Sequence, residues 1–171
     1  MTGSAHPGAR ILGRLRSADG AGVVRIEDRY DTEIGDLWSA LTDPRRLARW
    51  YGQVEGDLRA GGQFRGHLES WDGTGRVDAC EPPRRLLVTT RGSDEPYDEV
   101  IEATLTADAD QTLLVIETRG MPLDLIAFYG VGYQIHAENL AAHVAGRDRG
   151  DTKTRWDQLV PAYQDLAASV G

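Results

Sequence analysis

The sequence contains little of what several protein classes require. It has one cysteine, Cys80, which cannot form a disulfide within the chain and whose strand-like surroundings favour a buried, inert thiol. No run approaches 18 apolar residues, and the first residues lack the apolar middle of a signal peptide, so we expect no membrane span and a cytoplasmic protein. The 19 Lys and Arg are outnumbered by 27 Asp and Glu, and a net charge of −8 disfavours nucleic acid as a partner.

Motifs of several enzyme classes are missing as well. The chain has no Gly-x-Ser-x-Gly elbow, no glycine loop in the context of a phosphate site, and no His-Glu-x-x-His sequence. His136 and His143 are two helical turns apart, about 10 Å along the axis, which is too far to share one zinc ion. We therefore expect no nucleophilic catalysis, no metal and no other cofactor.

What the 171 residues do contain indicates one domain of ordinary size. Residues 1–8 are small, polar or Pro/Gly and predict a flexible N-terminus, and residues 9–171 are expected to form a single domain. Within it, residues 151–170 form an extra helical segment in which Pro161 introduces a kink or starts a second short helix.

Local patterns predict the order of the elements. Two runs flanking a Gly-rich turn predict a hairpin, and two short helices follow, the first capped by Asp31 or Thr32 and the second by a Thr-Asp-Pro sequence. Strands separated by Gly, Pro and Asp clusters then predict an antiparallel meander, and a long helix closes the pattern. The expected ranges are 11–16 and 23–30 for the hairpin, 34–41 and 44–50 for the short helices, 63–71, 75–80, 86–91, 98–106 and 111–119 for the strands, and 125–146 for the long helix.

Several motifs, in order over about residues 20–146, resemble those of a known family. They are Leu37-Trp38-Ser39-Ala40-Leu41-Thr42-Asp43-Pro44, Asp57 to Gly62 with Phe64, Glu81-Pro82-Pro83-Arg84-Arg85-Leu86, and Gly132-Tyr133 leading to Leu140 to Gly146. The resemblance is to the heat-shock-protein ATPase activator homologue-like branch of the START-like superfamily, also called SRPBCC, and it implies an α+β helix-grip fold, in which a curved antiparallel sheet wraps around a long C-terminal helix and leaves a cavity. Because the motifs are mostly structural, they imply no particular reaction.

The sequence departs from this family on the long helix. Relatives usually carry Trp at the position of Tyr133 and an apolar residue at the position of His136. On a helical wheel, His136, Asn139 and His143 fall within about 60° of one another, in the middle of an apolar stripe that runs from Ile135 to Tyr133.

A buried polar group without a partner costs roughly 1–3 kcal/mol, so these three side chains need a reason to be there. We expect them to face the cavity and to bind the polar end of a ligand. The alternative is that both histidines are structural groups bonded to Tyr, Thr or Glu on the sheet. Further ligand-binding candidates are the aromatic residues expected near the cavity and its mouth, Trp50, Tyr51, Phe128, Tyr129 and Tyr133.

Acidic and basic side chains on the strands are assigned by alternation. Ile101, Ala103 and Leu105 are expected to face inward, which leaves Glu102 outside. His67, Glu69 and Trp71 share one face of their predicted strand and are expected outside too, whereas the orientation of Glu117 cannot be set because its strand is apolar on both faces.

Three functional hypotheses follow. The leading one is a module that binds a small hydrophobic or aromatic molecule between the sheet and the C-terminal helix. The second is a cyclase or dehydratase in which His136 or His143 is the acid or base. The third, a co-chaperone-like stress-response protein with a chaperone partner, is implied by the family resemblance alone. The residues leave the oligomeric state undecided, a homodimer included.

Overall fold

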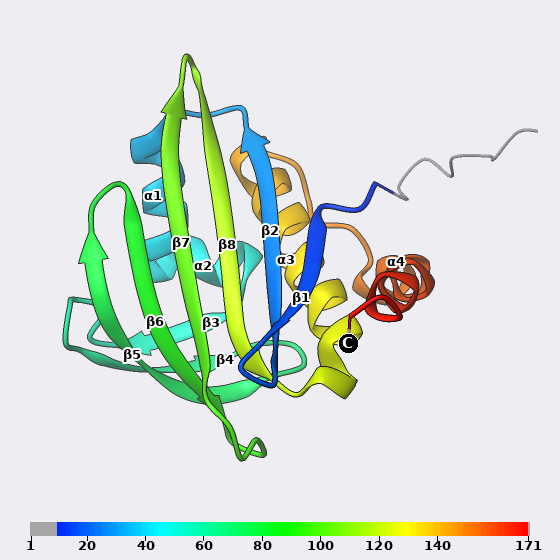
Figure 1. Ribbon diagram of the computed structural model, residues 1–171. Coiled ribbons are helices and arrows are strands. Elements are labelled where there is room, and N and C mark those ends of the chain that lie inside the picture. Colours follow the sequence, from blue (N-terminus) through cyan, green and yellow to red (C-terminus); the bar gives the residue numbers. More distant parts are fainter. Residues whose placement is uncertain (1–9, 171) are drawn as a thin grey trace, which may run out of the picture.

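A computed structural model describes residues 10–170, so the flexible terminus predicted for residues 1–8 lies outside the described residues. Within these residues, eight strands form an antiparallel sheet in the order β1-β2-β8-β7-β6-β5-β4-β3 (Figure 1). The strands are β1 (Gly13–Ala18), β2 (Ala21–Tyr30), β3 (Gln53–Gly56), β4 (Gln63–His67), β5 (Asp72–Glu81), β6 (Arg85–Gly92), β7 (Glu99–Asp108) and β8 (Gln111–Met121).

Two short helices, α1 (Ile34–Thr42) and α2 (Pro44–Trp50), connect β2 to β3. The predicted start of α2 is confirmed, because Pro44 occupies the first turn and the Asp43 side chain accepts a hydrogen bond from the Arg45 amide at 2.9 Å. The predicted cap of α1 is wrong. Glu33 occupies the cap position and makes no side-chain capping bond there, while the Thr32 hydroxyl donates to Asp36 instead.

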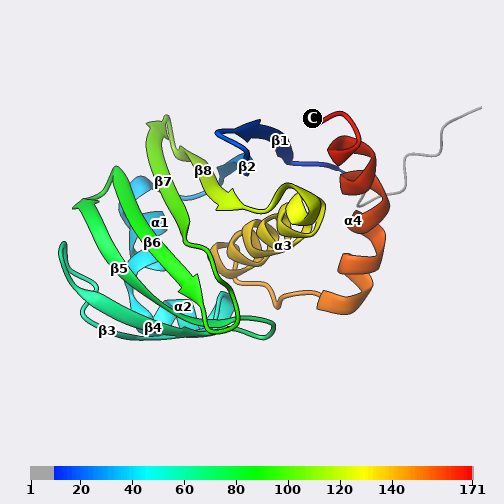
Figure 2. The ribbon, with the colours of Figure 1, turned by 60° about the horizontal axis from the view of Figure 1, so that its bottom comes forward.

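Two longer helices follow the sheet. After a short 3₁₀ turn (Leu123–Leu125), α3 (Ile126–Val144) crosses the concave side of the sheet, and α4 (Thr152–Ala167) packs against α3 from the other side (Figure 2). Pro161 lies inside α4, which is one continuous helix, so the second short helix considered for this segment does not form. The helix-grip fold predicted from the sequence is confirmed.

The curvature of the sheet has local causes. The register shifts between Gly22 and Val23 in β2 and between Val77 and Ala79 in β5, and such irregularities bend strands and increase their twist. The strand β3 was not predicted, because its four residues Gln53-Val54-Glu55-Gly56 carry no alternating pattern long enough to recognise.

Helix α3 is buried on two sides. One side packs on the sheet, α1 and α2 through a cluster that includes Leu37, Leu114 and Leu140. The other side packs on α4 through a cluster that includes Val131, Ile135 and Leu159. A helix buried between two layers has no single apolar stripe, and this property matters for the site described below.

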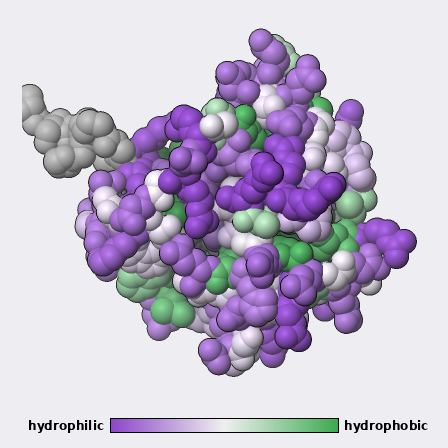
Figure 3. All heavy atoms as spheres, turned by 180° about the vertical axis from the view of Figure 1, so that it is seen from behind, coloured by the Kyte–Doolittle hydropathy of each residue, from purple (hydrophilic) through white to green (hydrophobic). Residues whose placement is uncertain are grey.

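The surface seen from behind is mainly hydrophilic, with hydrophobic residues in smaller areas of its lower half (Figure 3). Among the described residues, the most exposed large hydrophobic side chains are Leu125, Phe128 and Leu166. No helix within residues 10–170 combines the length and hydropathy that a membrane span requires.

Candidate functional site

An apolar cavity of about 150 Å³ lies between the sheet, α2 and α3, and we call it the inner cavity. Dry apolar cavities of this size accept a molecule as large as benzene. Its few polar groups include the His136 imidazole and the hydroxyls of Tyr51, Tyr133 and Thr90. The apolar lining includes Leu41, Leu47, Trp50, Val54, Phe64, Trp71, Val77, Leu86, Val88, Ile101, Ala103, Ile116 and Leu140.

Glycines in β5 allow two aromatic rings to line this cavity closely. A Cβ atom at Gly75 would collide with the ring of Phe64, its cross-strand neighbour, and a Cβ atom at Gly73 would collide with the ring of Trp71. Aromatic rings can lie over a strand in this way only where the backbone carries no side chain. Trp71 was grouped with the outward residues His67 and Glu69, but β4 ends at His67, and a turn in which the Leu68 amide donates to the Trp71 carbonyl reverses the alternation.

His136 brings a polar edge into the inner cavity. Its ring centroid lies 4.8 Å from that of Tyr51 and 6.2 Å from that of Tyr133. Its buried Nδ1 atom has no hydrogen-bond partner among the described residues. Burial, assisted by the charge of Arg149, lowers the pKa of His136 to about 4, so the imidazole is neutral at physiological pH.

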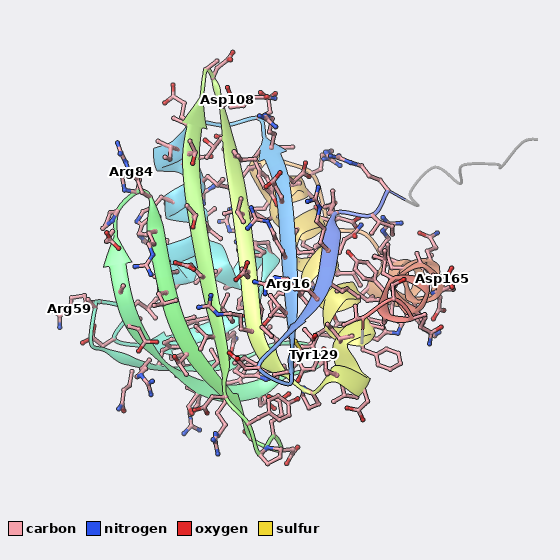
Figure 4. The ribbon with its side chains drawn as sticks, viewed as in Figure 1. Arg16, Arg59, Arg84, Asp108, Tyr129 and Asp165 are labelled. Carbon is pink, nitrogen blue, oxygen red and sulfur yellow. The ribbon has the colours of Figure 1, made fainter. Side chains whose placement is uncertain are left out.

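A second space of about 230 Å³ adjoins the inner cavity at the start of α3, and we call it the mouth. The two spaces share Tyr51, Tyr133 and His136 among their lining residues. Phe128, 40% exposed, stacks on Trp156 of α4 at its rim, with 6.1 Å between ring centroids. Tyr129 also lines the mouth and lies near the lower end of the sheet (Figure 4).

Two carboxyl groups, those of Glu95 and Glu99, line the mouth. The oxygens of Glu95 accept hydrogen bonds from the Trp71 indole at 3.1 Å, the Tyr129 hydroxyl at 2.5 Å, the Tyr97 hydroxyl at 3.2 Å and a backbone amide. Glu99, by contrast, is 3% exposed, and its Oε1 atom has no partner among the described residues. Burial, reinforced by the charge of Glu95, raises the pKa of Glu99 to about 8, so this carboxyl is largely protonated at pH 7.

Glu99 was missed in the sequence, although a signal for it existed. Alternation had placed Ile101, Ala103 and Leu105 on the inner face of β7, and Glu99 is in the same phase two residues before Ile101. The other acidic assignment on that strand is confirmed, because Glu102 faces outward, where it pairs with Arg85 at 2.7 Å. Glu117, which could not be assigned, also lies on the outer face, beside Arg16 and Arg119.

The structure separates the three polar residues of α3 that were expected to face one cavity. His136 lines the inner cavity and the mouth, together with Tyr133 and Tyr51. Asn139 and His143 lie instead in an outer hollow beside Arg49 and residues 146–149. His143 there accepts a hydrogen bond at its Nε2 atom from Arg46 Nε at 3.1 Å, so its partner is an arginine of α2 and not the Tyr, Thr or Glu of the sheet that the structural alternative named.

The correction has a simple geometric cause. The predicted stripe joined Ile135 with Tyr133 and Leu140, but Ile135 belongs to the face of α3 that packs on α4. The predicted stripe therefore combined two separate buried faces of α3, one toward the sheet and one toward α4. Its centre fell on the border between these faces, where Asn139 and His143 lie. The cavity-facing direction of the helix runs instead through His136, Leu140, Tyr133 and Ala137.

The remaining predicted site residues lie as follows. Trp50 lines the inner cavity and donates its indole N–H to the Ala40 carbonyl at 2.9 Å. Phe128 and Tyr129 line the mouth, at the border where they were expected. Cys80 is half-buried in β5, less enclosed than predicted. Within residues 10–170, no group of three or more His, Cys, Asp or Glu side chains is arranged to hold a metal ion.

Comparison with known proteins places the chain in a family. Residues 31–145 match the family model described as "Activator of Hsp90 ATPase homolog 1-like protein", so the chain belongs to this family. Among the curated proteins, no sequence matches the chain significantly.

Solved structures of similar proteins support the same fold. The crystal structure of CalU16 from Micromonospora echinospora is 30% identical, with a TM-score of 0.77 over 92% of this chain and 96% of that one. The solution structure of CalU16 is 27% identical, with a TM-score of 0.76 over 98% and 99% of the two chains. DynU16, from the dynemicin biosynthetic locus, is 26% identical with a TM-score of 0.70, and the match covers 79% of this chain and 51% of DynU16.

Proposed function

We propose that this protein binds a small, mainly apolar or aromatic molecule, with its body in the inner cavity and its polar end toward the mouth. The observation that carries the proposal is a lining that is apolar apart from a few groups at one end, where His136 Nδ1 lacks a partner. Ligand sites are concave and mostly apolar, with a small number of placed polar groups.

Each lining group has a role in this proposal. Trp50 and the aliphatic side chains of the sheet contact the body of the ligand. Tyr51 and Tyr133 flank His136, whose neutral ring accepts a hydrogen bond from a ligand hydroxyl or donates one to a ligand carbonyl, depending on which nitrogen carries the proton. Phe128 and Tyr129 border the entrance.

The similarity to DynU16 supports a ligand of the natural-product kind. That protein belongs to the dynemicin biosynthetic locus, and a binding module beside a biosynthetic route would hold an intermediate or a product. Fold similarity alone assigns no chemistry, so the apolar lining of the cavity carries the proposed ligand class.

The test uses a neutral aromatic probe whose ring has the size that the inner cavity accepts, benzyl alcohol, titrated into the protein and followed by NMR. In the variant Ala103→Phe a phenyl ring occupies the inner cavity, because Ala103 is 6% exposed and lines it. The matched control is Thr104→Phe, one residue further on the exposed face of the same strand. We expect the probe to bind the native protein and Thr104→Phe equally, and to bind Ala103→Phe at least about tenfold more weakly. Equal binding by all three proteins would refute the proposed location.

A second candidate function is an acid–base enzyme of the cyclase or dehydratase kind. The observation that favours it is the pair of opposite pKa shifts in one connected space, because a neutral imidazole at His136 can accept a proton while a protonated Glu99 can donate one. Turnover of an aromatic or polyketide-like substrate that survives both His136→Ala and Glu99→Gln would exclude this mechanism.

A further inference from the structure

Glu99 is an acidic group placed where the fold needs none. It lies on the inner face of β7 opposite Thr90 of β6, in line with the apolar side chains that close the cavity. It is 3% exposed, it lines the mouth, and its Oε1 atom has no hydrogen-bond partner in the part of the chain that the structure describes. Such an atom costs stability, and a ligand that supplies a donor would remove the cost.

Aromatic rings surround this carboxyl group. Tyr51 approaches from the end of α2, and Tyr129 and Tyr133 approach from α3. The negative charge of Glu99 raises the pKa of each of these three hydroxyls, in addition to the larger effect of burial, which is a sign of their proximity. The faces of aromatic rings attract cations, most strongly where water is excluded.

The charges around the mouth are of one sign. Glu95 contributes a second carboxyl group, Tyr97 bonds to it from the same loop, and His136 is neutral. No Arg or Lys is among the residues that line the mouth within the described chain. A carboxyl group in this position with no positive partner is expected to be protonated when the site is empty, and burial together with Glu95 raises its pKa to about 8.

We propose that the ligand of this protein carries an amine whose ammonium group binds Glu99 at the mouth, among Tyr51, Tyr129 and Tyr133. This inference rests on the proposed function and specifies the chemical class of the ligand. The ammonium donates an N–H to Glu99 Oε1 and lies against the tyrosine rings, while the apolar body of the molecule fills the inner cavity.

The inference is tested with two probes of nearly the same shape, benzylamine and benzyl alcohol. Their dissociation constants are measured by NMR titration at pH 6, 7 and 8 with the native protein, Glu99→Gln and Glu102→Gln. The last variant is the matched control, because Glu102 lies on the same strand but faces outward.

In the native protein and in Glu102→Gln, we expect the amine to bind at least about tenfold more tightly than the alcohol at pH 8. Its affinity should also rise more than tenfold from pH 6 to pH 8, because Glu99 must lose a proton to pair with the ammonium, which like other alkyl amines stays charged in this range. Glu99→Gln should bind the alcohol as before and should lose both the preference and the pH dependence.

Two results would overturn the inference while leaving the proposed function intact. One is a native protein that binds the alcohol as tightly as the amine at pH 8, which would assign the mouth to a neutral ligand. The other is a preference for the amine that persists in Glu99→Gln. Binding of neither probe to the native protein would overturn the proposed function, and the amine with it.

Discussion

Replacement of Glu99 by glutamine should stabilise this protein, and should do so only above a certain pH. A glutamate in the unfolded chain has a pKa of 4.5, whereas burial raises the pKa of Glu99 to about 8 in the folded state. Between these values the unfolded chain has released the proton that the folded protein still holds. Folding therefore takes up a proton, and the free energy of unfolding decreases as the pH rises.

The size of the effect follows from the width of this window. Each unit of pH reduces the free energy of unfolding by roughly 1.4 kcal/mol, so Glu99 costs roughly 4 to 5 kcal/mol at pH 8 relative to pH 4.5. Glutamine has no proton to exchange. The free energy of unfolding of Glu99→Gln minus that of the native protein should therefore grow by several kcal/mol over this range.

The measurement is urea unfolding of both proteins, followed by circular dichroism, at pH 4.5, 6, 7 and 8. Any change in packing caused by the amide shifts all four points equally, so the slope with pH isolates the buried carboxyl group. Glu102→Gln provides the control for loss of a charge on this strand, since its ion pair with Arg85 is on the outer face. A difference that stays flat from pH 5 to pH 8, or that grows toward acid, would show that the folded protein does not hold a proton on Glu99.

Two further substitutions test the buried polar groups of α3, His136 and Gln134. The free energy of unfolding of His136→Leu, relative to that of the native protein, should rise by roughly 2 kcal/mol as the pH falls from 6.5 to 5, because the folded native protein keeps His136 neutral down to about pH 4. Urea unfolding at both pH values measures this difference. A gain confined to alkaline pH would contradict the prediction. Gln134→Ala should lower the free energy of unfolding by about 3 kcal/mol in the same assay, because the fully buried amide group forms hydrogen bonds with Tyr163, Arg10 and Leu12. Gln158→Ala, on the exposed surface of α4, is the control. Equal losses of stability in the two variants would refute the role of Gln134.

The sequence predicted the elements whose signals are local. The Thr-Asp-Pro cap at Asp43, the alternation of β7 and the Gly, Pro and Asp separators each act over a few residues, and the elements that they predict are present. The strand β3 escaped because it has only four residues.

The candidate site was harder to predict, because the residues that line it depend on which face of α3 packs on the sheet and which packs on α4. His136, Tyr133 and Tyr51 could be proposed from position alone, but the phase of α3 could not be set without knowing that α4 covers its other face. Gln134 illustrates the same difficulty: on the side of the helix opposite the predicted stripe, it is fully buried and bonded to α4 and to the segment before β1. Glu99 was within reach of the alternation rule, which was applied to its neighbours only.

If small apolar molecules bind under α3, isoleucine methyl groups will report the binding directly. With the δ1 methyls labelled, titration of benzyl alcohol should shift the signals of Ile101 and Ile116, which line the inner cavity. The signals of Ile126 and Ile135, which pack in the other two clusters, should stay in place. Shifts confined to Ile126 and Ile135, or no shifts at saturating probe, would show that the inner cavity does not bind such molecules.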